Sequence, residues 1–364
     1  MSDPSLQPQA PAPAGCDRSI AAPPPGGAER IFSIDAFRVA AILAVICLHT
    51  LPFQSKAFAG EYWRTTAGAI NQLARFAVPF FFLASGFFFG RKLRQGACPR
   101  TMMAQYAGRL LVPFAAWSMV YLVVPANLVQ VMRYGVLRNT YWKLAQAWAN
   151  PVNFAFEGFS DHLWFLTALA CGLAMLTVFR RRVEALAVLA SLFYLLHVFN
   201  NSYHPMVTDR VLPFNARNGP GVGTLFVLIG YLLSSPRVKC SIGAAVAIFF
   251  GGMSMHLAEA FLLERFYNVP LDANDYLLGT IPWAAGALLV CLARPQWGKS
   301  LAPLGAFTLG IYLVHPLLVR LMRPIGNALG SCWWEIVLPF VVYGLSLAVV
   351  SGMMRAKRLR KLVI

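Results

Sequence analysis

Residues 33–50 read SIDAFRVAAILAVICLHT, and this stretch decides what kind of protein the chain encodes. It is apolar over most of its length, and about 20 such residues in a helix cross the ~30 Å hydrocarbon core of a bilayer. Arg38 and His49 lie within this segment. An ionisable side chain inside a membrane segment is costly, so both residues are candidates for function.

The spacing of Arg38 and His49 places them on one face of the helix. Eleven residues at about 100° each complete about three turns, so the two side chains lie ~16 Å apart along one stripe. A guanidinium and a titratable imidazole on one stripe suit a long anionic ligand that enters from one side of the membrane. Each residue also has an ordinary explanation, because an arginine can extend its head to the interface and a histidine can bond a neighbouring helix.

The composition extends this interpretation to the whole chain. The sequence has 364 residues, of which 58% are hydrophobic and 12% are charged, whereas soluble domains carry about 25% charged residues. We therefore predict an all-α integral membrane protein with about ten transmembrane helices. The ten apolar segments are residues 34–54, 69–90, 110–131, 161–179, 183–200, 219–236, 240–263, 274–293, 302–323 and 333–354.

The net charge of +17 does not indicate nucleic-acid binding, because the basic residues lie in short runs between apolar segments. When alternate connections are compared, 19 Lys and Arg residues fall on one side and 10 on the other. The richer side is expected to be cytoplasmic, which places both termini inside. Residues 1–30 are rich in Pro, Ala and Gly and are predicted to form a disordered cytoplasmic tail. Residues 31–364 are predicted to form one transmembrane domain.

Other ionisable residues also lie in or beside the apolar segments. Arg75 is in the outer half of the second segment, Asp161 and His162 open the fourth, and His315 precedes Pro316 in the ninth. For a further set, packing or hydrogen bonding between helices is the favoured interpretation. These residues are Ser85, His197, His256 and Glu259.

Five motifs, in order, resemble those of the acyltransferase-3 family of membrane acyltransferases. The first is the Arg38-x10-His49 pair within SIDAFRVAAILAVICLH, which is similar to the Arg/Lys-x10-His motif of that family. The other four are VPFFFLASGFFF (78–89), RLLVPFAAW (109–117), HLWFL (162–166) and LGIYLVHPLL (309–318). The resemblance covers roughly residues 31–354.

The resemblance implies about ten transmembrane helices and transfer of an acyl group, usually acetyl, from cytoplasmic acyl-coenzyme A to a glycan hydroxyl. On this basis Arg38 and Arg109 are expected to bind the phosphates of acetyl-coenzyme A, and His49 is expected to be the general base. Residues expected to bind the acceptor or relay protons are Asp161, His162, His315 and Arg75. A covalent acyl-histidine or acyl-serine intermediate stays open. No metal site is expected, because the six histidines lack ligand spacing.

The expected function is O-acetylation of a sugar hydroxyl, with mannose as one candidate, on a lipid-linked or nascent exopolysaccharide in the bacterial inner membrane. Three alternatives stay open: a transporter or flippase for a lipid-linked sugar, a membrane sensor or scaffold, and transfer of succinyl in place of acetyl. The transporter is disfavoured because the chain shows no internal repeat, whereas many transporter folds are built from such repeats.

Overall fold

The structure is a computed structural model that describes residues 30–54, 56–125, 132–207 and 215–363. Within these residues the regular elements are helices, and no strand occurs. Eight stretches of the described chain are long and apolar enough to cross a membrane, and two further apolar helices are shorter. The prediction of an all-helical, multi-pass membrane protein is therefore confirmed. The predicted tail lies outside the described residues except for Arg30.

Each of the ten predicted segments overlaps one of these helices. The eight long stretches are α1 (Phe32–Thr50), α2 with α3 (Glu61–Leu73, Ala77–Arg94), α4 (Pro99–Val123), η2 with α8 (Asp161–Leu163, Trp164–Phe179), α9 (Val183–Asn200), α12 (Ile242–Tyr267), η4 with most of α14 (Ala302–Phe307, Thr308–Leu329) and α15 (Cys332–Arg355). The two shorter helices are α11 (Val222–Leu233) and α13 (Thr280–Ala293). Short connecting or terminal helices are η1 (Lys56–Phe58), α6 (Val136–Ala149), α7 (Pro151–Glu157), α10 (His204–Val207), η3 (Leu271–Ala273) and α16 (Lys357–Arg360).

Several predicted boundaries are wrong by more than a few residues, among them the start of the second segment, which was predicted at residue 69 although the apolar stretch begins at Glu61. The third segment was predicted at 110–131, but α4 begins at Pro99, in the first helical position that suits proline. Most of the predicted 91–109 loop is therefore helical, and residues 126–131 lie outside the described chain. The eighth segment was predicted from residue 274, but α13 begins at Thr280, because η3 is followed by an irregular connection that ends in a turn.

Among the described helices, the pairs α3–α11 and α12–α13 pack with their main chains in close contact. In the pair α3–α11, Gly86 lies against the carbonyl of Val227 and Gly230 lies against the carbonyl of Leu83. A methyl group at either glycine would collide with the partner's backbone. Small residues permit this approach, and close van der Waals packing is a main source of helix association in a bilayer. The pair α12–α13 is built in the same way, with Gly252 against the backbone of Trp283.

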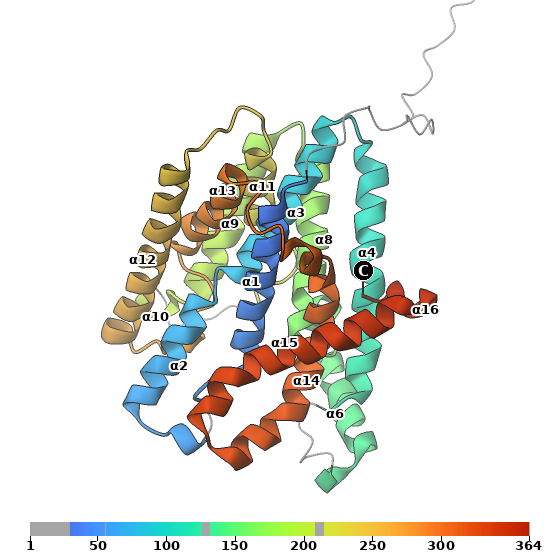
Figure 1. Cartoon of the computed structure of the whole chain (residues 1–364), viewed down its shortest axis with the longest axis vertical. Helices are drawn as coiled ribbons and strands as arrows, with labels where there is room; N and C mark the ends of the chain where they lie inside the picture. Colours follow the sequence, from blue (N-terminus) through green and yellow to red (C-terminus); the bar gives the residue numbers. More distant parts are fainter. Residues whose placement is uncertain (1–29, 55, 126–131, 208–214, 364) are drawn as a thin grey trace, which may run out of the picture. The chain divides into compact units, whose positions relative to one another are not determined.

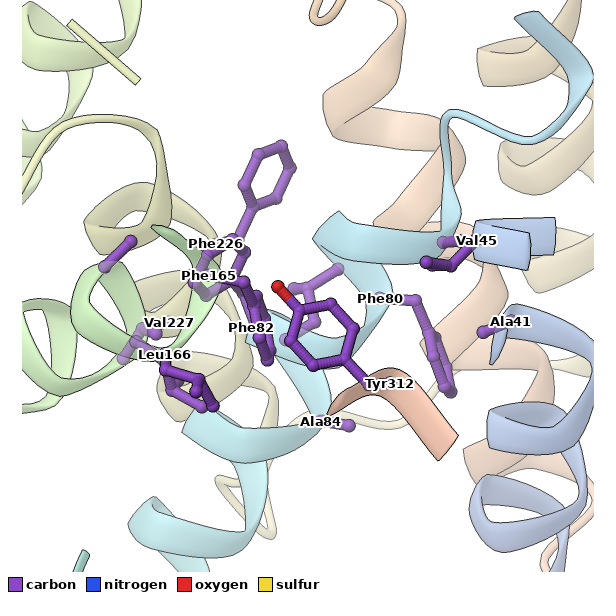
Figure 2. Packing of buried hydrophobic residues seen from close by; sticks show 14 of the residues in the cluster. Ala41, Val45, Phe80, Phe82, Ala84, Phe165, Leu166, Phe226, Val227 and Tyr312 are labelled. Carbon is purple, nitrogen blue, oxygen red and sulfur yellow. The ribbon is translucent and has the colours of Figure 1, made fainter. Parts of the chain in front are cut away.

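The core joins helices that are far apart in the sequence. Figure 2 shows side chains from five of them around Tyr312 of α14. They come from α1 (Ala41, Val45), α3 (Phe80, Phe82, Ala84), α8 (Phe165, Leu166), α11 (Phe226, Val227) and α14 (Tyr312). α15 crosses α1 and α14 obliquely (Figure 1). This arrangement brings the end of α1, the start of α8 and the middle of α14 together.

Candidate active site

Three histidines from distant parts of the chain form one cluster. His49 lies near the end of α1, His162 in η2 and His315 in α14. The ring centroid of His49 is 5.0 Å from that of His315 and 6.2 Å from that of His162, and the latter two rings are 5.8 Å apart. Since His162 and His315 are buried and His49 is half-buried, His49 is the imidazole best placed to meet a substrate.

His162 is held by a polar chain that reaches it from α14. Ser160 is the last residue before η2, and its Oγ lies 3.0 Å from Nδ1 of His162. Arg320 of α14 donates from Nη2 to the same Oγ at 3.0 Å. The guanidinium also lies over the ring of Tyr121, 5.0 Å from its centroid. A buried cation near an aromatic face is stabilised by the ring quadrupole, so Arg320 is fixed behind Ser160.

His315 is held by its own helix. Its Nδ1 lies 3.1 Å from the carbonyl oxygen of Ile311, one turn earlier. The next residue is Pro316, which has no N–H and so leaves the carbonyl of Tyr312 without its usual helical donor. The imidazole of His315 also interacts with that carbonyl. The His315-Pro316 pair therefore fixes the orientation of this ring.

Two tyrosines form an aromatic wall beside the cluster. The ring centroids of Tyr121 and Tyr312 lie 4.9 Å and 5.5 Å from that of His162. The hydroxyl of Tyr121 donates to the carbonyl of Leu313 at 2.7 Å and so ties α4 to α14. This wall limits the access of water to the imidazoles.

A lysine holds the end of the helix that carries Tyr121. Lys143 of α6 donates from Nζ to the carbonyl oxygens of Tyr121 and Val124, each at 2.5 Å. Carbonyls at the end of a helix have no partner within the helix, and a lysine can satisfy them. Burial lowers the pKa of Lys143 to about 8, and the nearby charge of Arg320 acts in the same direction.

Three buried nitrogens around the cluster have no hydrogen-bond partner in the described part of the chain. They are Nε2 of His162, Nε2 of His315 and Nη1 of Arg320. Buried polar atoms are nearly always paired, so such exceptions call for an explanation. Several unpaired buried nitrogens are expected to lie close together where a polar substrate or reaction intermediate supplies their hydrogen-bond partner.

The two residues expected at the donor end lie on different helices, Arg38 on α1 and Arg109 on α4. Arg38 pairs with Asp35 at 3.0 Å, and its guanidinium carbon lies 5.2 Å from the ring centroid of Phe88 on α3. Arg109 is exposed on α4. Tyr106 is within electrostatic range of both arginines. Both Arg38 and His49 therefore contact neighbouring helices, as a shared inward stripe requires.

Arg75 belongs to a separate polar network at the predicted outer side. It donates to Asn71 at 2.9 Å and pairs with Asp275 at 2.5 Å. Asp275 also pairs with Arg217 at 3.1 Å. Burial acts to raise the pKa of Asp275, but the two guanidinium groups outweigh it and hold this pKa below its ordinary value. Arg75 and Arg217 remain within electrostatic range of His49.

The remaining expected residues lie outside the cluster. Asp161 is exposed, although it is within electrostatic range of His49. The four residues with a packing interpretation contact neighbouring groups: Ser85 donates to the Phe81 carbonyl, His197 packs on Tyr276, His256 bonds with Gln72 and Thr280, and Glu259 accepts from the Gly279 amide.

Sequence reasoning did not single out Ser160, Arg320 or Tyr121. Arg320 carried a usable signal, because an arginine within an apolar segment is a functional candidate. Ser160 and Tyr121 carried none, since a serine before a helix and a tyrosine in an apolar helix are ordinary.

A cavity of about 230 Å³ lies on the predicted outer side, between α7, α9 and residues 215–221. Its walls include Phe156, Phe193 and Asn218. The amide nitrogen of Asn218 donates to Glu157 at 2.8 Å, while its Oδ1 is buried without a partner among the described residues. The cavity thus offers aromatic faces with polar side chains in its wall. Among all the residues that the structure describes, no group of three or more His, Cys, Asp or Glu residues is arranged to hold a metal ion.

Sequence comparisons with known proteins find distant relatives of this chain. The chain is 26% identical over 320 residues to an amino-acid racemase of Enterococcus faecalis and 25% identical over 297 residues to a serine/alanine racemase of Enterococcus gallinarum. These matches cover 82% and 78% of this chain but only 42% and 40% of the relatives, so the chain spans less than half the length of the curated relatives it matches. No solved structure matches the chain.

A family model described as an acyltransferase domain matches residues 31–353. This range holds the whole histidine cluster, both arginines of the donor end and nearly every described helix. The chain belongs to the acyltransferase-3 family of membrane proteins.

Proposed function

We propose that this protein moves an acetyl group from cytoplasmic acetyl-coenzyme A to a sugar hydroxyl of a lipid-linked or nascent exopolysaccharide, with mannose as one candidate sugar. The observation that carries the proposal is the half-buried imidazole of His49, backed by two buried imidazoles, on the helix that also carries Arg38. The bacterial inner membrane is the proposed location.

The donor is proposed to enter beside α1. Planar guanidinium groups bind phosphates through paired, charge-assisted hydrogen bonds. Arg38 and exposed Arg109, which both lie within electrostatic range of Tyr106, would bind the nucleotide phosphates at the cytoplasmic end. The pantetheine arm would then follow the helix for ~16 Å, the rise of eleven residues, and place the thioester near His49.

The chemistry requires one base and one group that stabilises negative charge. His49 would take the proton of the acceptor hydroxyl while the hydroxyl oxygen bonds to the thioester carbonyl carbon. The resulting oxyanion would be stabilised by a donor from the cluster. The carbon–sulfur bond then breaks, and the proton on His49 passes to the departing thiolate. An ester and free coenzyme A are the products.

The outer cavity is the proposed place for the acceptor. A sugar ring presents an apolar face and several hydroxyl groups, which match the phenyl rings of Phe156 and Phe193 and the amide side chains of Asn153 and Asn218 that line the cavity. The named relatives act on amino acids, so a hydroxyl amino acid such as serine is the second candidate acceptor.

The proposal is tested with radiolabelled acetyl-coenzyme A and membranes that contain the protein. We expect label to pass to the glycan fraction, and His49→Ala should lower the rate by about 100-fold or more, the usual contribution of a general base. His204→Ala is the matched control, because His204 is another half-buried histidine and lies on α10. Label in O-acetylserine would favour the second acceptor, and preference for succinyl-coenzyme A would change the donor. Wild-type membranes that transfer no acyl group would leave a transporter as the better assignment.

A further inference from the structure

We infer that His162 and His315 are held as opposite tautomers, so that His162 donates a hydrogen bond to the reacting carbonyl and His315 accepts one from His49. The inference rests on the proposed acyl transfer for the chemical roles, but not for the tautomers, which follow from hydrogen bonds within the protein. It assigns positioning roles to Ser160 and Arg320.

The tautomer of His315 follows from the partner of its Nδ1. A carbonyl oxygen can only accept a hydrogen bond, and Nδ1 lies 3.1 Å from the carbonyl oxygen of Ile311. The proton of the neutral ring must therefore be on Nδ1. Nε2 is left with a lone pair and has no partner among the described residues. His315 presents an acceptor to the cluster.

The tautomer of His162 follows from Ser160. The guanidinium of Arg320 can only donate, so its bond at 3.0 Å uses Ser160 Oγ as an acceptor. Among the described residues, the hydroxyl proton of Ser160 then has one neighbour that can accept it, namely Nδ1 of His162 at 3.0 Å. The opposite arrangement would leave a buried hydroxyl proton unpaired, at a cost of about 1–3 kcal/mol. Nδ1 is therefore the acceptor, and Nε2 carries the proton.

The positive charge of Arg320 strengthens this assignment. A hydroxyl that accepts a charge-assisted hydrogen bond becomes a better donor, because bonds in a chain polarise one another. The ring of Tyr121 and the bond to Ser160 fix the guanidinium in place. Ser160 and Arg320 thus act on the reaction only through His162.

The two tautomers fix which ring donates and which ring accepts a hydrogen bond within the cluster. When His49 takes the hydroxyl proton it becomes an imidazolium with two N–H donors, and its ring centroid is 5.0 Å from that of His315. The lone pair on Nε2 of His315 can accept one of these donors, which stabilises the cation and leaves the other to return its proton to the thiolate. The Nε2–H of His162, whose ring forms the third corner of a triangle with His49 and His315, can meet the oxyanion.

The tautomers can be measured directly in the full-length protein. Ring nitrogens of ¹⁵N-histidine give distinct NMR signals with and without a proton, and His162→Gln and His315→Gln assign the signals by their loss. We expect a protonated Nδ1 and a bare Nε2 for His315, and the reverse for His162. Ser160→Ala should shift the Nδ1 signal of His162 toward that of a nitrogen without a hydrogen bond and leave His315 unchanged, whereas Ser160→Thr should preserve both. A protonated Nε2 on His315 or a protonated Nδ1 on His162 would overturn the inference.

The rate of acyl transfer provides a second test of the inference. A glutamine can place an amide N–H₂ near the position of Nε2, whereas an asparagine reaches only that of Nδ1. His162→Asn should lower kcat by about 100-fold, as loss of one oxyanion donor does, and His162→Gln should recover about tenfold of this. Equal rates for the two variants would refute the donor role. Absence of acyl transfer in the wild type would refute the proposed function instead, with the tautomers still read by NMR.

Discussion

Arg38 and His49 illustrate how much of a site can be predicted from the periodicity of one helix. Their spacing of eleven residues places them on a common stripe by helical geometry alone, and both side chains contact neighbouring helices in the structure. Arg38 lies in an ion pair with Asp35 and over Phe88. This environment orients the guanidinium.

Replacement of Arg38 by lysine should weaken donor binding more than turnover. Lysine keeps the charge but loses the planar fork that binds two phosphate oxygens. We expect the KM for acetyl-coenzyme A to rise about tenfold, the equivalent of one charge-assisted hydrogen bond of about 1.5 kcal/mol, with kcat changed by less than about threefold. Initial rates at several donor concentrations provide the check. An unaltered KM would exclude Arg38 from the phosphate site.

The rest of the cluster could not be derived from spacing. Periodicity relates residues within one helix, whereas His49 lies on α1, Ser160 just before η2 and Arg320 on α14, so they come together only in the folded chain. The five motifs nevertheless marked His162 and His315, because each is an ionisable residue where the membrane disfavours one. Ser160 stayed hidden, since its role depends on a guanidinium 160 residues away in the sequence.

At the scale of the helix, hydropathy predicts the apolar part and not the ends. α4 extends eleven residues before its predicted start, because its polar first turns can project beyond the hydrocarbon core and remain helical. α13 starts later than predicted, because the apolar residues before it pack as a turn around Leu271 and Leu277. The boundaries of an apolar membrane segment therefore need not coincide with the boundaries of the helix that contains it.

Adjacent glycines of α12 provide a matched test of the backbone contacts. Gly252 meets the main chain of Trp283, whereas an added methyl at Gly251 has open space around it. Gly252→Ala should lower the free energy of unfolding by about 1–3 kcal/mol, as overpacking does. Gly251→Ala should be neutral or stabilising by up to about 1 kcal/mol, because alanine favours a helix. Thermal unfolding in detergent measures the stability of both variants. If Gly252→Ala is as stable as the wild type, the contact with Trp283 is loose.

For the whole molecule, the excess of Lys and Arg on one side predicts which ends of the helices face the cytoplasm. Two native cysteines test this orientation. Cys332 is exposed at the predicted outer start of α15, and Cys240 is half-buried in the predicted cytoplasmic connection before α12.

A membrane-impermeant maleimide should label Cys332 in right-side-out vesicles and should reach Cys240 only after the membrane is opened. Cys332→Ser should abolish the outside labelling, and Cys240→Ser should reduce only the labelling that follows opening. Mass spectrometry of the labelled peptides identifies each site. Outside labelling of Cys240 would invert the assigned topology and move the proposed donor site to the wrong membrane face.

The main-chain contacts that join α3 to α11 and α12 to α13 also restrict how the protein can open. Helices that touch in this way cannot slide past each other by a fraction of a turn without steric collision, so each pair moves as one rigid body. Any movement that admits the acceptor to the imidazoles is therefore expected to leave both pairs intact and to displace other elements of the protein.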